Sequence, residues 1–154
     1  MESVWDYPRP PRLEPSALPV RVEHAGQVVA TSDRAWRVLE TAHPPVYYVP
    51  RDDVAVEMLV PLAVTSFCEW KGQAVYLDVA VPGAERARRA AWSYPRPRAP
   101  YEELSDAVAF YAQRLDACFV GDEQVRPQPG LFYGGWITAG LRGPFKGGPG
   151  SEAW

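Results

Sequence analysis

Residues 64–81, VTSFCEWKGQAVYLDVAV, are the stretch that decides the fold. Two runs rich in β-branched and aromatic residues, 64–67 and 73–81, flank a short connection, 68–72, that ends in glycine. Runs of this kind are typical of strands, and a short connection that contains glycine is typical of a hairpin. The stretch therefore predicts a β-hairpin with a cysteine, a tryptophan and a lysine at its tip.

Similar short runs lie on both sides of this hairpin. They predict a first hairpin from 20–23 and 27–31, single strands at 36–40 and 46–49, and a last hairpin from 108–111 and 115–120. Helical signals are few: Asp52 or Asp53 is suited to cap a short helix that ends near Leu59. Residues 101–106 fit one helical turn, whereas residues 84–92 fit a helix by propensity and a strand by their flanking prolines. The sequence predicts a mostly β protein with little helix.

The two ends of the chain differ in composition from its middle. Residues 1–19 are rich in proline, which cannot donate to a ladder of backbone hydrogen bonds, so they predict an extended arm anchored by Trp5 and Tyr7. Residues 127–154 are rich in glycine and proline and predict an ordered coil packed on the domain. The β-domain itself is expected over residues 20–126.

Length and composition restrict the class of protein. A chain of 154 residues with 47% hydrophobic residues is one domain with a packed core. No run approaches the roughly 18 apolar residues of a membrane span, and the first residues do not resemble a signal segment, so we expect a soluble, cytoplasmic protein without membrane contact. The net charge of −3 argues against nucleic acid as a partner. The oligomeric state stays open.

Five blocks of sequence resemble the domain of unknown function 427 family over roughly residues 20–120. The blocks are Leu39–Val54 with its two prolines and two tyrosines, Cys68–Gly72 with Tyr76, Ala91–Tyr94, Val108–Tyr111 and Gly143–Gly148. The resemblance implies a β-tent-like domain, in which two antiparallel sheets lean together and enclose a pocket. Some domains of that shape hold zinc with two Cys-x-x-Cys motifs, and this sequence has neither. The family also carries a nucleotidyltransferase-like label, which no motif of this sequence supports.

Metal and phosphate chemistry have weak support in the sequence. The possible metal ligands are Cys68, Cys118, His24 and His43, and no two of them are close in sequence. The sequence therefore predicts no metal and no cofactor. The glycine-rich tail lacks the Gly-Lys-Ser/Thr pattern of a phosphate-binding loop. The sequence therefore predicts neither a structural zinc site nor nucleotidyl transfer.

Lysine is scarce in this chain. Of its 16 basic residues, 14 are arginine, and the two lysines, Lys71 and Lys146, both stand between an aromatic residue and a glycine. A lysine amine is compact and can lose its proton when desolvated, unlike a guanidinium. We therefore expect Lys71, on the hairpin tip, to bind as an ammonium or an amine that arginine cannot replace. Lys146 lies in the predicted coil and is expected to matter less.

Three functions remain open at this point. The leading hypothesis is that a planar or anionic metabolite binds in an aromatic pocket. The pocket would be lined by Tyr48, Trp70, Tyr76, Trp92 and Tyr94, with Lys71 and Glu40 as polar contacts. An enzyme would use Glu40, Lys71 and Cys68 for general acid–base or nucleophilic chemistry. A protein-interaction module would dock through the repeated Trp-x-Tyr-Pro-Arg-Pro segments, 5–10 and 92–97. Two structural roles compete with these: a buried, inert Cys68 thiol, and an ion pair between Glu40 and Lys71.

Overall fold

The computed structural model describes residues 1–154 and contains fifteen strands, five short 3-10 helices and no α-helix. The strands are β1 (Glu2–Ser3), β2 (Arg12–Pro15), β3 (Val20–His24), β4 (Gln27–Ser32), β5 (Trp36–Leu39), β6 (Val46–Tyr48), β7 (Leu59–Cys68), β8 (Gly72–Val79), β9 (Ala87–Ser93), β10 (Val108–Phe110), β11 (Ala117–Val120), β12 (Glu123–Gln124), β13 (Arg126–Pro127), β14 (Trp136–Ile137) and β15 (Leu141–Arg142). The 3-10 helices are η1 (Val4–Asp6), η2 (Arg51–Asp53), η3 (Val56–Met58), η4 (Glu102–Leu104) and η5 (Ala112–Arg114). The prediction of a mostly β fold is confirmed.

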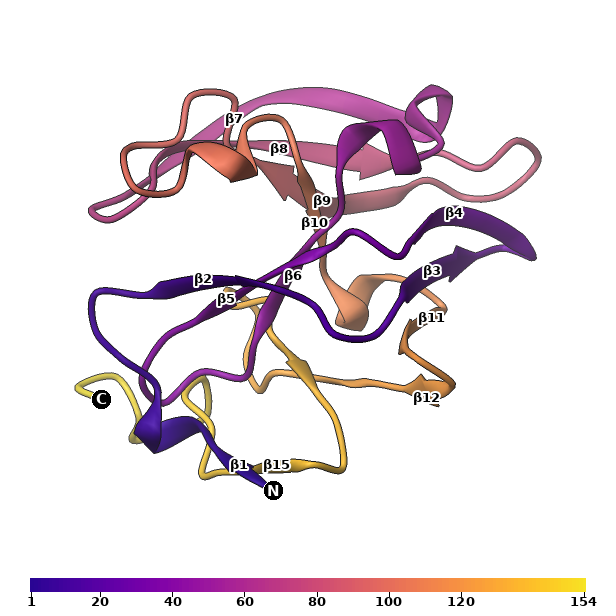
Figure 1. Cartoon of the computed structure of the whole chain (residues 1–154). Coiled ribbons are helices and arrows are strands. Elements are labelled where there is room, and N and C mark those ends of the chain that lie inside the picture. The colour runs from indigo at the N-terminus through magenta and orange to yellow at the C-terminus, as the bar shows by residue number, and fades with distance from the viewer.

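The strands form two antiparallel sheets of four strands and one of three. The first has the order β10-β9-β8-β7, and the second the order β12-β11-β3-β4. The three-stranded sheet has the order β2-β5-β6, and two pairs of two-residue strands, β13-β14 and β1-β15, complete the fold. In Figure 1 the β7–β10 sheet lies above the other two, and both chain termini lie at the opposite end of the molecule.

The central hairpin forms as the sequence predicts. β7 and β8 pair antiparallel from Leu59↔Val79 to Cys68↔Gly72, so the tip lies within the predicted connection 68–72 and its unpaired part is residues 69–71. Most of the ambiguous segment 84–92 is a strand, which begins at Ala87, because β9 pairs with a strand on each side, β8 and β10. Backbone pairing on both edges outweighs the helix propensity of its alanines and arginines.

The predicted hairpin of 108–111 with 115–120 is wrong. β10 pairs with β9 in the first sheet, whereas β11 pairs with β3 in the second. Helix η5 lies between them, where the chain crosses from one sheet to the other. Both predicted runs contain strands, but the two strands do not pair with each other.

The helix expected after Asp52 or Asp53 is also absent as one element. Two three-residue helices, η2 and η3, stand in its place, because Val54 between them is extended and pairs with Ala30 of β4. Helix η4, in contrast, lies within the predicted helical turn.

The N-terminal arm joins a sheet, contrary to the expectation that its prolines prevent it. β2 pairs with β5 from Arg12↔Leu39 to Pro15↔Trp36, because the prolines lie before the strand or at its last residue and leave its middle free to bond. Of the two expected anchors, Tyr7 is buried and packs with Val4 and Leu39. Trp5 is 41% exposed and packs edge-on against Trp154.

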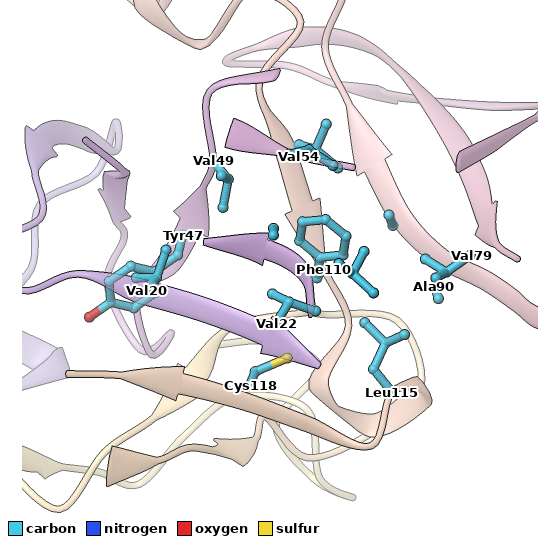
Figure 2. Packing of buried hydrophobic residues seen from close by; sticks show 14 of the residues in the cluster. Val20, Val22, Tyr47, Val49, Val54, Val79, Ala90, Phe110, Leu115 and Cys118 are labelled. Carbon is cyan, nitrogen blue, oxygen red and sulfur yellow. The ribbon is translucent and has the colours of Figure 1, made fainter. Parts of the chain in front are cut away.

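The main core lies between the two four-stranded sheets. Figure 2 shows Val22 of β3, Phe110 of β10 and Val79 of β8 pointing into the same space. The tail adds Trp136 to this core, where its ring stacks on Tyr47 with centroids 5.1 Å apart and its Nε1 donates to the Phe110 carbonyl. Outside its two-residue strands the tail is coil, and Trp136 fixes that coil to the domain. None of the helices is long and apolar enough to cross a membrane.

Candidate binding pocket

A pocket of about 470 Å³ opens between the β7–β8 hairpin, the strands behind it and the C-terminal tail. All eight site residues predicted from the sequence line it: Glu40, Tyr48, Cys68, Trp70, Lys71, Tyr76, Trp92 and Tyr94. Residues from four separate segments of the chain thus meet at one cavity. Their role in binding or catalysis stays a prediction.

Strand geometry brings three of the rings together. Tyr76 on β8 and Trp92 on β9 are cross-strand partners, and Tyr94 follows Trp92 by two residues. Side chains that are opposite each other or two apart along a strand share one face of a sheet. Tyr111 continues this face beyond β10, with its ring centroid 4.5 Å from that of Trp92. The strands therefore form an aromatic wall.

Tyr48 lies at the back of this wall and is almost fully buried. Its hydroxyl accepts a hydrogen bond of 3.2 Å from Nε1 of Trp92. Burial raises the pKa of both Tyr48 and Tyr94 above the ordinary value of a phenol. Both rings therefore present neutral hydroxyl groups over the whole physiological pH range.

Lys71 is 7% exposed, although it stands on a hairpin tip. Its Nζ donates to Sγ of Cys68 at 3.4 Å and lies 5.7 Å from the ring centroid of Tyr94. None of the ion pairs in the structure includes Lys71. A buried ammonium without a carboxylate partner is costly, so an anion that enters the pocket gains a strong interaction here.

Glu40 does not form the ion pair with Lys71 that the sequence left open. Its carboxylate lies 3.6 Å from Nε of Arg9 and 3.9 Å from Nε2 of His43. Arg9 belongs to the N-terminal arm, so the arm supplies the cation for this carboxylate. Glu40 therefore shares the cavity with Lys71 and Cys68 without joining their contact.

Cys68 is half-buried and lines the pocket, so its thiol is not enclosed in the core. Cys118 is enclosed there: it is 1% exposed, and burial raises its pKa to about 12. The two free cysteines thus differ in access, which makes Cys118 an internal reference for the reactivity of Cys68.

The tail forms a second wall that sequence reasoning missed. Gln128, Phe132, Tyr133, Gly134 and Lys146 all line the pocket. A β-carbon built on Gly134 would collide with the indole ring of Trp92, so only glycine lets the tail approach the aromatic wall so closely. The Gly-Gly pair before Trp136 was the available signal, because conformational freedom beside an anchoring tryptophan indicates a close backbone approach.

His43 is buried and joins the two walls. Its Nδ1 lies 3.0 Å from Nε2 of Gln128, and its ring packs edge-on against Tyr133 with centroids 4.8 Å apart. Burial lowers its pKa to about 4, and the positive charges of Lys146, Arg9 and Lys71 act in the same direction. His43 is therefore neutral at physiological pH.

Lys146 lies at the same cavity as Lys71, rather than in a part of the coil remote from it. Its Nζ donates to the main-chain oxygen of Trp154 at 3.1 Å and lies 5.6 Å from the ring centroid of Tyr133. Both lysines of the chain therefore line one pocket, each beside a tyrosine ring. They differ in that the Lys146 ammonium has an oxygen partner from the protein.

The positions of the possible metal ligands bear on the metal chemistry considered from the sequence. The histidine, cysteine and acidic side chains form no group of three or more that could hold a metal ion.

The rings of the repeated segments point inward, since Tyr7, Trp92 and Tyr94 are buried and only Trp5 is exposed. A partner protein that docked through both segments would therefore contact only one exposed ring, that of Trp5.

The model of a family described as a domain of unknown function (DUF427) matches residues 12–121. This range contains the aromatic wall, Glu40, His43 and the Cys68–Lys71 contact, and it ends before the tail residues of the pocket. No curated protein matches the chain.

Proposed function

The chain belongs to the domain of unknown function 427 family, and we propose that it binds a small planar molecule with an anionic group in the aromatic pocket. The observation that carries the proposal is Lys71, a buried ammonium among rings with no carboxylate partner. A ligand anion would supply the missing charge, and a flat ring would pack against the aromatic wall.

The size and lining of the pocket support a ligand of this kind. A volume of about 470 Å³ falls in the range of known small-molecule sites. Twelve of the twenty lining residues are hydrophobic, and the polar groups are few. Small-molecule sites commonly combine a mostly apolar surface with a few polar groups that fix the orientation of the ligand.

A thermal-shift screen against planar organic acids tests the proposal. At about 100 times its dissociation constant, a ligand should raise the melting temperature by roughly 5–10 °C. Lys71→Met should abolish this shift, because it removes the ammonium and keeps an unbranched apolar stem of four heavy atoms. Since it also removes an unpaired buried charge, we expect the unliganded variant to melt no lower than the wild type.

Arg126→Met is the matched control for the screen. It removes one positive charge from an exposed position outside the pocket and should keep the full shift. The proposal is wrong if no planar acid stabilises the wild type, or if Lys71→Met is stabilised as strongly as Arg126→Met.

The contact between Cys68 and Lys71 favours a second candidate, an enzyme with a thiol nucleophile. An ammonium 3.4 Å from a sulfur stabilises the thiolate, which is the reactive form of cysteine. Because Glu40 stands apart from this pair, the pair itself would carry the covalent step, and Glu40 would serve another part of a substrate.

Alkylation by iodoacetamide, followed by mass spectrometry, tests this candidate directly. Cys68 should react and Cys118 should not, and Lys71→Met should slow the reaction of Cys68 by roughly tenfold as the thiolate loses its counter-charge. An unchanged rate in Lys71→Met would show that the lysine does not activate the thiol, and this candidate would fail.

A further inference from the structure

Gln128 holds one fixed orientation in the wall formed by the tail. It is 1% exposed, its Oε1 accepts from the Gly135 amide at 3.0 Å, and its Nε2 donates to the Lys146 carbonyl at 2.8 Å. If the side-chain amide were flipped, Nε2 would face the Gly135 N–H and Oε1 would face the Lys146 carbonyl, so neither hydrogen bond could form. Two main-chain groups therefore determine which end of the amide faces His43.

This orientation determines the tautomer of His43. The end of the amide that faces the ring is Nε2, which only donates, so Nδ1 of His43 must accept its hydrogen bond. In a neutral imidazole with an accepting Nδ1, the proton resides on Nε2. His43 therefore presents an Nε2–H donor, and Gln128 is the positioning residue that fixes it.

The Nε2–H donor lies beside an acceptor in the same cavity. Nε2 is 3.9 Å from Oε2 of Glu40, which is too long for a hydrogen bond between them. The Glu40 carboxylate accepts no hydrogen bond from the protein and has Arg9 as its counter-charge at 3.6 Å. A donor and an acceptor thus stand side by side at the pocket, and neither satisfies the other.

We propose that His43 and Glu40 together recognise an amide edge, –NH–C(=O)–, on the ring of the ligand. The ligand carbonyl accepts from Nε2 of His43, and the adjacent ligand N–H donates to the Glu40 carboxylate. This inference rests on the proposed function and narrows its ligand to planar heterocyclic lactams that carry an acid group. Because Gln128 lies beyond residues 12–121, the orientation of the donor depends on the tail rather than on the part of the chain that the family model matches.

The tautomer is tested first, without any ligand. Long-range ¹H–¹⁵N spectra of the imidazole rings at pH 7 should show His43 protonated at Nε2 alone. In Gln128→Glu the group that faces Nδ1 becomes an acceptor, so the spectrum should change to a ring protonated at Nδ1. Gln124→Glu makes the same charge change on an exposed strand and should leave the spectrum unchanged. A wild-type ring protonated at Nδ1, or no change in Gln128→Glu, overturns the inference.

Ligand preference is tested next by calorimetry with two planar carboxylates. Uracil-6-carboxylate carries the amide edge, and benzoate lacks it. The wild type should bind the first at least tenfold more tightly, and both Gln128→Glu and His43→Phe should reduce this preference below threefold. Gln124→Glu should keep it.

The outcomes separate this inference from the proposed function. Binding of benzoate or other planar acids without a preference for the amide edge overturns the inference and leaves the proposed function standing. A preference that persists in Gln128→Glu and His43→Phe also overturns the inference. If no planar acid binds or stabilises the wild type, the proposed function itself fails, and the inference fails with it.

Discussion

The two walls of the pocket are built in different ways. The aromatic wall consists of side chains on paired strands, among them Tyr76, Trp92 and Tyr94, and the sequence identified all three. The tail wall consists of coil, and the sequence singled out only Lys146 there, for its scarcity and not for its position. Regular strand pairing makes the direction of a side chain predictable from the sequence. A coil is positioned by single close contacts, which no periodic sequence pattern predicts.

The contacts that position the tail involve glycines. A β-carbon on Gly147 would overlap the Pro129 carbonyl oxygen, and one on Gly134 would overlap the Trp92 ring. The backbone at Gly147 also has φ of 130°, in the region that favours glycine. The tail wall therefore depends on the absence of side chains, while the aromatic wall depends on their presence.

The largest expected effect is that of Gly147→Ala. The collision with a main-chain oxygen and the unfavourable φ should together cost about 4 kcal/mol, which lowers the melting temperature by roughly 10 °C. Gly148→Ala is the matched control, because no atom lies within 4 Å of a β-carbon there, and it should melt within about 2 °C of the wild type. Equal melting temperatures for the two variants would show that the tail does not pack as described.

The second effect concerns His43, which joins the two walls, and it depends on pH. Its pKa is about 4 in the folded protein against an ordinary value of 6.5, so between these pH values the unfolded chain binds a proton that the fold excludes. The free energy of unfolding should therefore fall by about 3 kcal/mol as the pH drops from 6.5 to 4.

Urea unfolding at several pH values measures this loss of stability. His43→Asn keeps an acceptor for Gln128 and removes the titrating group, so its stability should change less over the same pH window. If the wild type and His43→Asn lose stability equally between pH 6.5 and 4, then His43 is not the group that titrates.

The same contrast between regular and irregular structure explains what could be predicted of the fold. The mostly β class and the β7–β8 hairpin followed from local runs of β-branched and aromatic residues. The pairings of β10 with β9 and of β11 with β3 did not, because neither pair is joined by a short turn that the sequence would mark. Local patterns identify strands, but the choice between a neighbouring and a distant partner depends on the apolar surface that each pairing buries.

The candidate site shows this limit as well. The eight site residues could be predicted because rings, a lysine, a cysteine and a carboxylate stood out against their local sequence, and the fold brings all eight to one pocket. His43 and Gln128 did not stand out, since a lone histidine before two prolines and a glutamine in a proline-rich segment resemble ordinary loop residues. Their roles arise from a hydrogen bond between residues 85 positions apart.

A smaller effect is expected within the aromatic wall. Tyr48→Phe removes the only hydroxyl that accepts from Trp92 Nε1 and leaves that buried N–H without a partner. The loss should cost about 1–2 kcal/mol, seen as a lower midpoint of urea unfolding. Tyr133→Phe is the control in the tail wall: its hydroxyl makes no hydrogen bond with the protein, so the midpoint should hardly change. A Tyr48→Phe midpoint equal to that of Tyr133→Phe would contradict the described bond.

The central claim is that Lys71 contacts the anionic group of the ligand as a compact ammonium among rings, at a site that a guanidinium does not fit. The most direct test is the dissociation constant of the most stabilising planar acid, measured by calorimetry for Lys71→Arg and Lys146→Arg beside the wild type. A guanidinium is larger and planar, so Lys71→Arg should weaken binding at least tenfold, about 1.4 kcal/mol, whereas Lys146→Arg should stay within about threefold. Full affinity in Lys71→Arg would contradict the account, because any positive charge would then serve at this position.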